Sequence, residues 1–221
     1  MNLSEAMKER HSVRSYLDKP LEGNVLEELE KEIDKCNKES GLHIQLVKNE
    51  PKAFDSKMAH YGKFSGVKNY IALIGKKSSK LNELCGYYGE KIVLKAQMLG
   101  LNTCWVAMTY KKIPGVFTVN KDEKLTVVIC IGYGAVQGSA HKSKSSNSVS
   151  NADESAPEWF KKGIEAALLA PTAMNQQKFT FELQGNKVAA KPGLAFYSKV
   201  DLGIAKCHFE IGAGKDSSVW Q

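Results

Sequence analysis

The stretch Leu-Thr-Val-Val-Ile-Cys-Ile-Gly-Tyr-Gly at residues 125–134 decides the fold class of this chain. It is almost wholly apolar and ends in a Gly-Tyr-Gly turn, so it predicts a buried strand. Working outward, HIQLV (43–47) and NYIALIG (69–75) predict further strands, the second apolar enough to be buried on both faces. The segment 101–110 predicts a strand or an extended loop. These runs predict a central sheet.

Helical periodicity surrounds these strands. A short helix is predicted over 4–10, with a Ser4-x-x-Met7 cap, and a second begins near Gly23. A long helix is predicted over 81–99, with Gly100 at its C′ position. With strands and helices in this order, and no GxGxxG after a strand, the chain is α+β without a dinucleotide-binding domain.

The last third of the chain reads differently. Residues 138–156 are dominated by Ser, Asn and charge, which predicts a linker. Ser155 and Glu158 then form a capping box for a helix that stops at Ala170-Pro171. A hairpin over 178–184 and 187–191 follows, and Ser198 with Asp201 is expected to cap a final helix.

Composition limits the function classes. The chain has 221 residues, 43% of them apolar and 25% charged, typical of a globular protein. We expect a cytoplasmic protein, since no apolar run is long enough for a membrane helix and the N-terminal stretch lacks a signal-peptide core. Five cysteines without a CxxC pair argue against disulfides and structural zinc. The net charge of +7 comes from scattered lysines, and it indicates no nucleic-acid partner by itself.

Four stretches carry residues suited to binding chemistry. Arg10-His11-Ser12-Val13-Arg14 places two guanidiniums and a hydroxyl at alternate positions, the groups that a terminal phosphate needs. The other three are His141-Lys142-Ser143-Lys144, Ala170-Pro-Thr-Ala-Met-Asn-Gln-Gln177 and Asn102-Thr-Cys-Trp-Val-Ala-Met108. Each of the four stretches also has a plain structural interpretation, in the same order: solvated surface, linker, helix-ending loop and core packing.

Taken in order, these stretches resemble the nitroreductase family of FMN enzymes. R-H-S-V-R is similar to the family's R-[RH]-S-x-[RK] opening, L-G-L-N-T-C-W-V to its G-L-G-T-C-W segment, and V-V-I-C-I-G-Y-G to its A-I-G-Y-G strand. A-P-T-A-M-N-Q-Q-K-F resembles A-P-S-x-x-N-x-Q-P-W-x-F. In ordinary members that last loop follows the second helix, whereas here it comes late. The chain therefore resembles a rearranged subgroup, the TM nitroreductase type.

The resemblance implies a three-layer α-β-α fold with a central mixed or antiparallel sheet. It also implies a half over 1–140, a linker over 141–156, and a C-terminal half over 157–221 that completes the flavin site, all within one compact unit. Because one chain could complete the site alone, the protein is expected to be a monomer or a homodimer.

The resemblance further implies FMN and NAD(P)H as cofactors. Arg10, Ser12 and Arg14 would hold the phosphate, ribityl chain and pyrimidine edge, with His11 in the same stretch, and Lys142 and Lys144 would add phosphate contacts. The remaining cofactor-binding residues would be Val106, Ala107 and Met108 near the flavin N5, and Pro171, Thr172, Ala173, Asn175 and Gln177 opposite. The family usually has an acidic residue and a glycine at 107–108, and Ala-Met here departs from that pattern.

The implied activity is electron transfer from NAD(P)H through the flavin N5 to a small acceptor such as a nitroaromatic or a quinone. No side chain is expected to act as a catalytic base or nucleophile, and no metal is expected. Arg14 is the candidate for stabilising the anionic reduced flavin. Two alternatives stay open: a flavin protein for storage or sensing, and a basic nucleic-acid-binding module. The acceptor and the choice of NADH or NADPH are not readable from the sequence.

Overall fold

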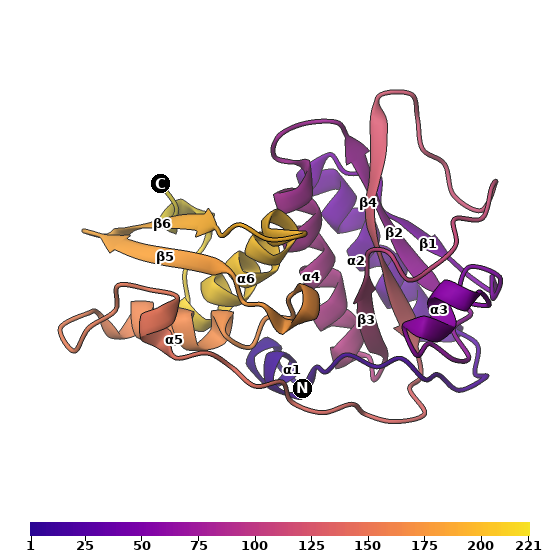
Figure 1. Ribbon diagram of the computed structural model, residues 1–221, viewed down its shortest axis with the longest axis horizontal. Helices are drawn as coiled ribbons and strands as arrows, with labels where there is room; N and C mark the ends of the chain where they lie inside the picture. Colours follow the sequence, from indigo (N-terminus) through magenta and orange to yellow (C-terminus); the bar gives the residue numbers. More distant parts are fainter. The chain divides into compact units, whose positions relative to one another are not determined.

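The computed structural model describes residues 1–221, which divide into two compact units. We call them the sheet unit, Glu9–Leu81 with Lys91–Ala140, and the hairpin unit, Met1–Lys8 with Asn82–Glu90 and His141–Gln221. Helix α4 (Leu81–Met98) supplies its N-terminal half to the hairpin unit and the remainder to the sheet unit. Figure 1 labels the elements of both units.

The sheet unit is built on four antiparallel strands in the order β1-β2-β4-β3. The apolar run that decides the fold class forms β4, which pairs with β2 along one side and with β3 along the other. The bounds are β1 (Gln45–Val47), β2 (Tyr70–Lys76), β3 (Asn102–Val106) and β4 (Glu123–Gly132). The predicted strands are present, and the sheet is antiparallel throughout.

Both faces of this sheet are buried, as the composition of β2 predicts. Tyr70, Ala72 and Ile74 belong to a core cluster on one face, which also contains Phe54 and Phe64. Neighbouring strand residues point to opposite faces, so Ile71 and Leu73 occupy the other face, and they are fully buried as well. A sheet covered on both sides is what a three-layer fold requires.

The helices of the sheet unit begin and end close to their predicted positions. α2 (Gly23–Ser40) buries Leu29, Ile33 and Cys36 on one stripe, and Gly41 closes it at φ +70°. α4 ends at Met98, and Gly100 follows at φ +77°, a conformation that favours glycine. The short α3 (Lys57–Tyr61) has Ser56 as its N-cap, whose side chain accepts from the Ala59 N–H.

The hairpin unit has an aromatic core. Phe209 of α6 (Ser198–Ala213) packs within 5.8 Å of Phe160, and within 5.1 Å of both Phe181 and Trp220, between ring centroids. Phe160 lies on α5 and Phe181 on β5, so this cluster joins the two helices to the hairpin. The other elements are α1 (Leu3–Glu9), α5 (Glu158–Ala167), β5 (Phe179–Gln184), β6 (Lys187–Pro192) and the 3₁₀ turns Ser146–Ser148, Ala173–Asn175 and Ser217–Val219.

Two glycines let α4 and α6 approach closely. A Cβ at Gly86 would collide with the carbonyl oxygen of Val200, and a Cβ at Gly203 with that of Glu83. Beyond this crossing, His208 Nε2 lies 2.8 Å from Glu90 Oε1, both fully buried, and His208 Nδ1 lies 3.1 Å from the Ala166 carbonyl. That carbonyl is only an acceptor, so Nδ1 carries a proton.

Three predicted helix caps are wrong. At α1, Asn2 and Glu5 form the reciprocal capping pair, instead of Ser4 with Met7. Ser155 donates its hydroxyl to Asp153, and no side chain caps α5. α6 also lacks a side-chain cap, because a left-handed Tyr197 precedes it and Asp201 is used elsewhere. A serine forms a capping box only when it occupies the N-cap position itself, and here α5 begins at Glu158 and α6 at Ser198, so neither Ser155 nor Ser198 is the N-cap.

The segment 141–156 packs within the hairpin unit. Val149 is fully buried, and its carbonyl accepts from the Phe181 N–H at 2.8 Å. The Asn151 side chain accepts from the Leu183 N–H at 2.8 Å. The α+β class is confirmed, and none of the helices has the length and apolar character needed to cross a bilayer.

Candidate functional site

The Arg10–Arg14 stretch runs beside β3 in the sheet unit. Ser12 forms a parallel bridge with Thr103, and the Val13 N–H donates to the Thr103 carbonyl at 3.0 Å. Arg10 and Val13 are buried, Ser12 is partly buried and Arg14 is exposed. The stretch is therefore held along the edge of the sheet beside β3, and the prediction that residues 10, 12 and 14 point the same way stays a prediction.

The side chains of Arg10, Ser12 and Arg14 all act on one buried thiol, Cys104 of β3. Burial raises the pKa of Cys104, while the Arg14 charge, a hydrogen bond from Ser12 and the Arg10 charge lower it. Arg10 is buried, whereas Arg14 is exposed with its guanidinium 5.9 Å from the centroid of the Phe64 ring. The stretch therefore concentrates positive charge and a hydroxyl at one place on the sheet unit.

These two residues are the only arginines among the 31 basic residues of the chain; the other 29 are lysines. Guanidinium differs from ammonium by its planar fork, which can donate two parallel hydrogen bonds to a carboxylate or a phosphate. All other basic side chains except the histidines are lysines, and both guanidinium groups lie within one five-residue stretch. This distribution favours anion recognition over general surface charge.

The turn after β4 packs against the same stretch. Gly138 has φ +74°, and a Cβ there would lie 2.9 Å from His11 Cβ and 3.1 Å from the Ser12 carbonyl oxygen. Asn102 ties this turn to β3: its Nδ2 donates to Gln137 Oε1 at 3.0 Å, and its Oδ1 accepts from the Gly134 N–H at 3.0 Å. The sequence predicts the Gly-rich turn, but neither the close packing of Gly138 nor the hydrogen bonds of Asn102.

The end of β3 presents the residues predicted to lie near the flavin N5. Val106 is buried, Ala107 is partly exposed, and Met108 has 64% of its surface exposed. The chain turns after Val106, so Ala107 and Met108 leave the sheet.

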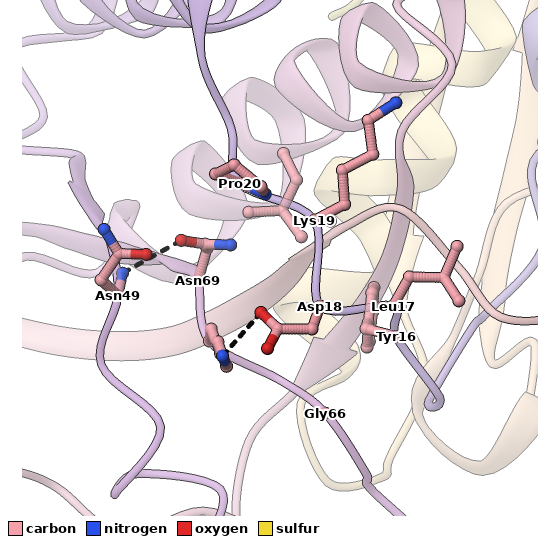
Figure 2. Close-up of a pocket in the computed structure, with 11 residues that line it drawn as sticks. Tyr16, Leu17, Asp18, Lys19, Pro20, Asn49, Gly66 and Asn69 are labelled. Carbon is pink, nitrogen blue, oxygen red and sulfur yellow. Dashed lines mark hydrogen bonds and ion pairs between the residues drawn. The ribbon is translucent and has the colours of Figure 1, made fainter.

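A small hollow in the sheet unit lies apart from these residues. Figure 2 shows it lined by Tyr16, Asp18, Lys19 and Asn69, among others, and Asn69 Oδ1 accepts from the Asn49 N–H at 3.1 Å. Asp18 accepts from Lys68 at 2.6 Å, and the Lys19 ammonium lies 3.9 Å from the centroid of the Tyr133 ring. None of the predicted cofactor-binding residues lines this hollow, and its charged groups are paired.

In the hairpin unit, the predicted residues 141–144 and 170–177 are joined by a polar network. Lys142 offers its carbonyl to Asn175 Nδ2 and to Gln177 Nε2, both at 2.9 Å. Lys144 donates its backbone N–H to Gln177 Oε1 at 2.9 Å and its ammonium to the Gln177 carbonyl at 3.1 Å. His141 reaches the Leu168 carbonyl at 2.9 Å. Residues separated by about 30 positions thus form one cluster.

Gln177 is the centre of this network. Its Nε2 donates to both the Lys142 carbonyl and Asn175 Oδ1, and its own N–H donates to Thr172 Oγ1 at 3.0 Å. An amide nitrogen has two hydrogens, so the donors of this side chain are fully used. With only 2% of its surface exposed, Gln177 orients the loop from within.

The loop is held in an unusual conformation by a buried carboxylate. Met174, Asn175 and Gln177 have φ of +50°, +53° and +43°, values that L-residues rarely adopt. Asp201, 3% exposed, accepts from the Ala173 N–H at 3.0 Å and from Gln176 Nε2 at 2.8 Å. Burial raises the pKa of Asp201 to about 6, even though both hydrogen bonds lower it. Sequence reasoning missed this role, because the spacing of Asp201 looked like a helix cap.

Comparisons with known proteins place the chain in a family. The model described as "Putative TM nitroreductase" matches residues 2–213. The chain belongs to this family. A solved nitroreductase from Thermotoga maritima has 27% identity and a TM-score of 0.67, over 96% of this chain and 83% of that one. A nitroreductase from Desulfovibrio desulfuricans, solved in complex with FMN, has 14% identity and a TM-score of 0.55, over 71% and 99% of the two chains. A Streptococcus pneumoniae family member has 13% identity and a TM-score of 0.54, over 67% and 98%.

Membership of the TM nitroreductase family confirms both the resemblance and the nitroreductase-like fold predicted from the sequence. No curated protein matches the chain. Within the family fold, the predicted residues form two groups, one in each unit: Arg10 to Arg14 with β3, and Lys142 to Lys144 with the 170–177 loop. No cluster of His, Cys, Asp or Glu has the composition of a metal site.

Proposed function

We propose that this member of the TM nitroreductase family is an FMN-dependent oxidoreductase that takes electrons from NAD(P)H and passes them to a small acceptor. The observation that carries the proposal is the Arg10–Ser12–Arg14 arrangement, which places both arginines of the chain and a hydroxyl around β3. Family membership supports an oxidoreductase, and the Desulfovibrio neighbour is in complex with FMN.

The donor set fits FMN from its phosphate to its pyrimidine edge. A phosphate monoester carries more than one negative charge and three acceptor oxygens, which the forked Arg10 guanidinium and the Ser12 hydroxyl can contact, and Arg14 would then lie toward the pyrimidine edge. Ser12 and the backbone are fixed by the bridge to Thr103, so the donors keep their spacing before any ligand arrives. Arg10 is held in place by burial, and the exposed Arg14 is the more accessible of the two.

In the hairpin unit, the resemblance assigns Lys142, Lys144, Pro171, Thr172, Ala173, Asn175 and Gln177 to the cofactor, and this assignment stays a prediction. The hydrogen bonds support different roles within the group. Gln177 positions the loop, since its amide hydrogens are both used internally. Asn175 is exposed and keeps one amide hydrogen for a ligand, and the Lys142 ammonium is also exposed.

FMN, when bound, supplies the redox chemistry: with NAD(P)H and a proton it can reduce a quinone to its hydroquinone, or a nitro group to a nitroso group and water. The protein residues bind, orient and stabilise charge. Arg14 is our candidate for the positive charge that favours the reduced cofactor. Ala107 and Met108 leave β3 without an acidic group, so no side chain there exchanges a proton.

The proposal is tested by loading the purified protein with FMN and adding NADH or NADPH without oxygen. We expect the flavin absorbance to bleach after mixing, at a rate that stopped flow can follow. Arg14→Ala should weaken FMN binding roughly tenfold, as loss of a charge-assisted contact predicts, and Arg14→Lys should restore only part of it. Lys38→Ala, at an exposed site on α2, is the matched control and should leave the affinity unchanged.

Each outcome separates the candidate functions. A colourless protein that ignores added FMN contradicts the proposal altogether. A yellow protein that neither nicotinamide reduces would instead be a flavin protein for storage or sensing. The oligomeric state, monomer or homodimer, stays a prediction that light scattering can measure. The cytoplasmic location also stays a prediction.

A further inference from the structure

Asn102, at the start of β3, links this strand to the turn that follows β4. Its side chain is buried, and both ends of its amide are used: Oδ1 accepts from the Gly134 N–H and Nδ2 donates to Gln137 Oε1, each at 3.0 Å. A primary amide carries a donor and an acceptor side by side, so one side chain can hold both partners. The family segment G-L-G-T-C-W has glycine where this chain has Asn102, so the motif itself does not supply this link.

The turn from Gly134 to Gly138 is packed closely around the Asn102 amide. A Cβ at Gly134 would lie 2.7 Å from Asn102 Oδ1 and 2.6 Å from the Val136 carbonyl oxygen. Contacts this short leave no room for a side chain at Gly134. The position of the turn therefore depends on the position of the Asn102 amide.

The same turn contacts the Arg10–Arg14 stretch, and all of these residues belong to the sheet unit. The Ala135 N–H donates to the Ser15 carbonyl at 2.9 Å. A Cβ at Gly138 would lie only 3.1 Å from the Ser12 carbonyl oxygen. Ser12 is also bridged to β3. Ser12 thus contacts both the strand and the turn, which Asn102 ties together.

We propose that Asn102 is a positioning residue for the phosphate group of FMN, and that it acts through the turn and Ser12 without contacting the phosphate itself. By fixing the turn against Ser12, Asn102 holds the Ser12 hydroxyl in place for the phosphate oxygens. A donor that is fixed before the ligand arrives loses less conformational entropy on binding than a mobile donor does. The inference rests on the proposed function, because it assigns a positioning residue to an FMN site.

The experiment titrates FMN into the purified protein, follows the flavin fluorescence, and records the phosphorus NMR resonance of bound FMN at saturation. Asn102→Ala should bind FMN roughly tenfold more weakly, because two hydrogen bonds that fix the turn are lost. The phosphorus resonance should move toward that of free FMN, while the visible absorbance of the bound flavin ring stays as in the wild type. Gln137→Ala removes one of the two bonds at an exposed side chain, and it should weaken FMN binding less than Asn102→Ala does.

The matched control is Asn37→Ala. Asn37 of α2 makes the same pair of bonds elsewhere in the sheet unit: Oδ1 accepts from the Ile44 N–H at 2.7 Å, and Nδ2 donates to the Ile44 carbonyl at 2.9 Å. Their loss should lower the stability of the protein in urea but leave FMN affinity and the phosphorus resonance unchanged. A merely structural role of Asn102 would make the two variants alike.

The outcomes are distinguishable. Wild-type protein that does not bind FMN overturns the proposed function and this inference together. Wild-type binding that is unchanged in both Asn102→Ala and Gln137→Ala overturns the inference alone. So does an Asn102→Ala variant that binds FMN more weakly without moving the phosphorus resonance, or an equal loss of affinity in Asn37→Ala. If Asn102→Ala does not fold, Gln137→Ala decides by the same two measurements.

Discussion

The buried carboxylate of Asp201 makes the stability of the protein depend on pH in a direction opposite to that of most acidic residues. Burial raises the pKa of Asp201 from 3.8 to about 6 in the folded state. The folded protein therefore holds this proton more tightly than the unfolded chain does. Lowering the pH through 6 stabilises the folded state, and raising it removes that contribution.

The size of the effect follows from the shift. A change from 3.8 to about 6 is worth about 3 kcal/mol in total, at ~1.36 kcal/mol per pKa unit. The linkage relation places about 1 kcal/mol of this between pH 5 and pH 7.5, because the unfolded chain is already almost fully ionised there. Solvent screening does not reduce this figure much, since the side chain is 3% exposed.

The assay compares wild-type protein with Asp201→Asn by urea unfolding at several pH values. All other titrating groups are shared by the two proteins, so the difference between their free energies of unfolding isolates Asp201. We expect this difference to move in favour of the wild type by about 1 kcal/mol as the pH falls from 7.5 to 5.

The matched control is Asp216→Asn, the same substitution at a site where a hydrogen bond from Ser218 lowers the pKa of the carboxyl. Asp216 stays ionised throughout this range, so its difference should be flat. A flat difference for Asp201→Asn as well, or one of opposite sign, would refute the argument that burial outweighs the bonds from Ala173 and Gln176.

Three further predictions follow from the packing of the hairpin unit and the burial of the thiols. Gly203→Ala should destabilise the protein by about 2 kcal/mol, because an overpacking cost of ~3 kcal/mol is reduced by a helix-propensity gain of ~1 kcal/mol. Unchanged stability in urea unfolding would show that α4 and α6 can move apart without cost. Gln177→Leu should lower the free energy of unfolding by about 2 kcal/mol, because the Lys144 N–H loses its partner and the Lys142 carbonyl keeps only the bond from Asn175; thermal unfolding measures this loss. The five cysteines are buried, and burial raises the pKa of Cys36 to about 12, so Ellman's reagent should titrate five thiols only after denaturation; rapid reaction of the native protein would contradict this.

Local patterns proved good guides to the elements. The apolar run at 125–134 is β4, the run at 69–75 is β2, and Gly100 follows the end of α4 with the expected positive φ. These features depend on side-chain alternation and on backbone preferences of neighbouring residues, which a sequence displays directly. The helix caps were less predictable, because a cap depends on the direction from which the chain enters the helix.

The sequence by itself determined the class of the fold, the family, and the position of both arginines on one stretch, since each depends on residue type and order along the chain. Only the tertiary structure showed that both amide hydrogens of Gln177 form hydrogen bonds within the local network. It also showed that Asp201 accepts hydrogen bonds from Ala173 and Gln176 and does not cap α6. The reason is physical: the hydrogen-bond partners of Gln177 and Asp201 lie 25 to 35 residues away for three of these bonds, and chain folding alone brings them within 3 Å. The same folding leaves Met174, Leu194 and Phe196 of the hairpin unit exposed, which their apolar character alone does not predict.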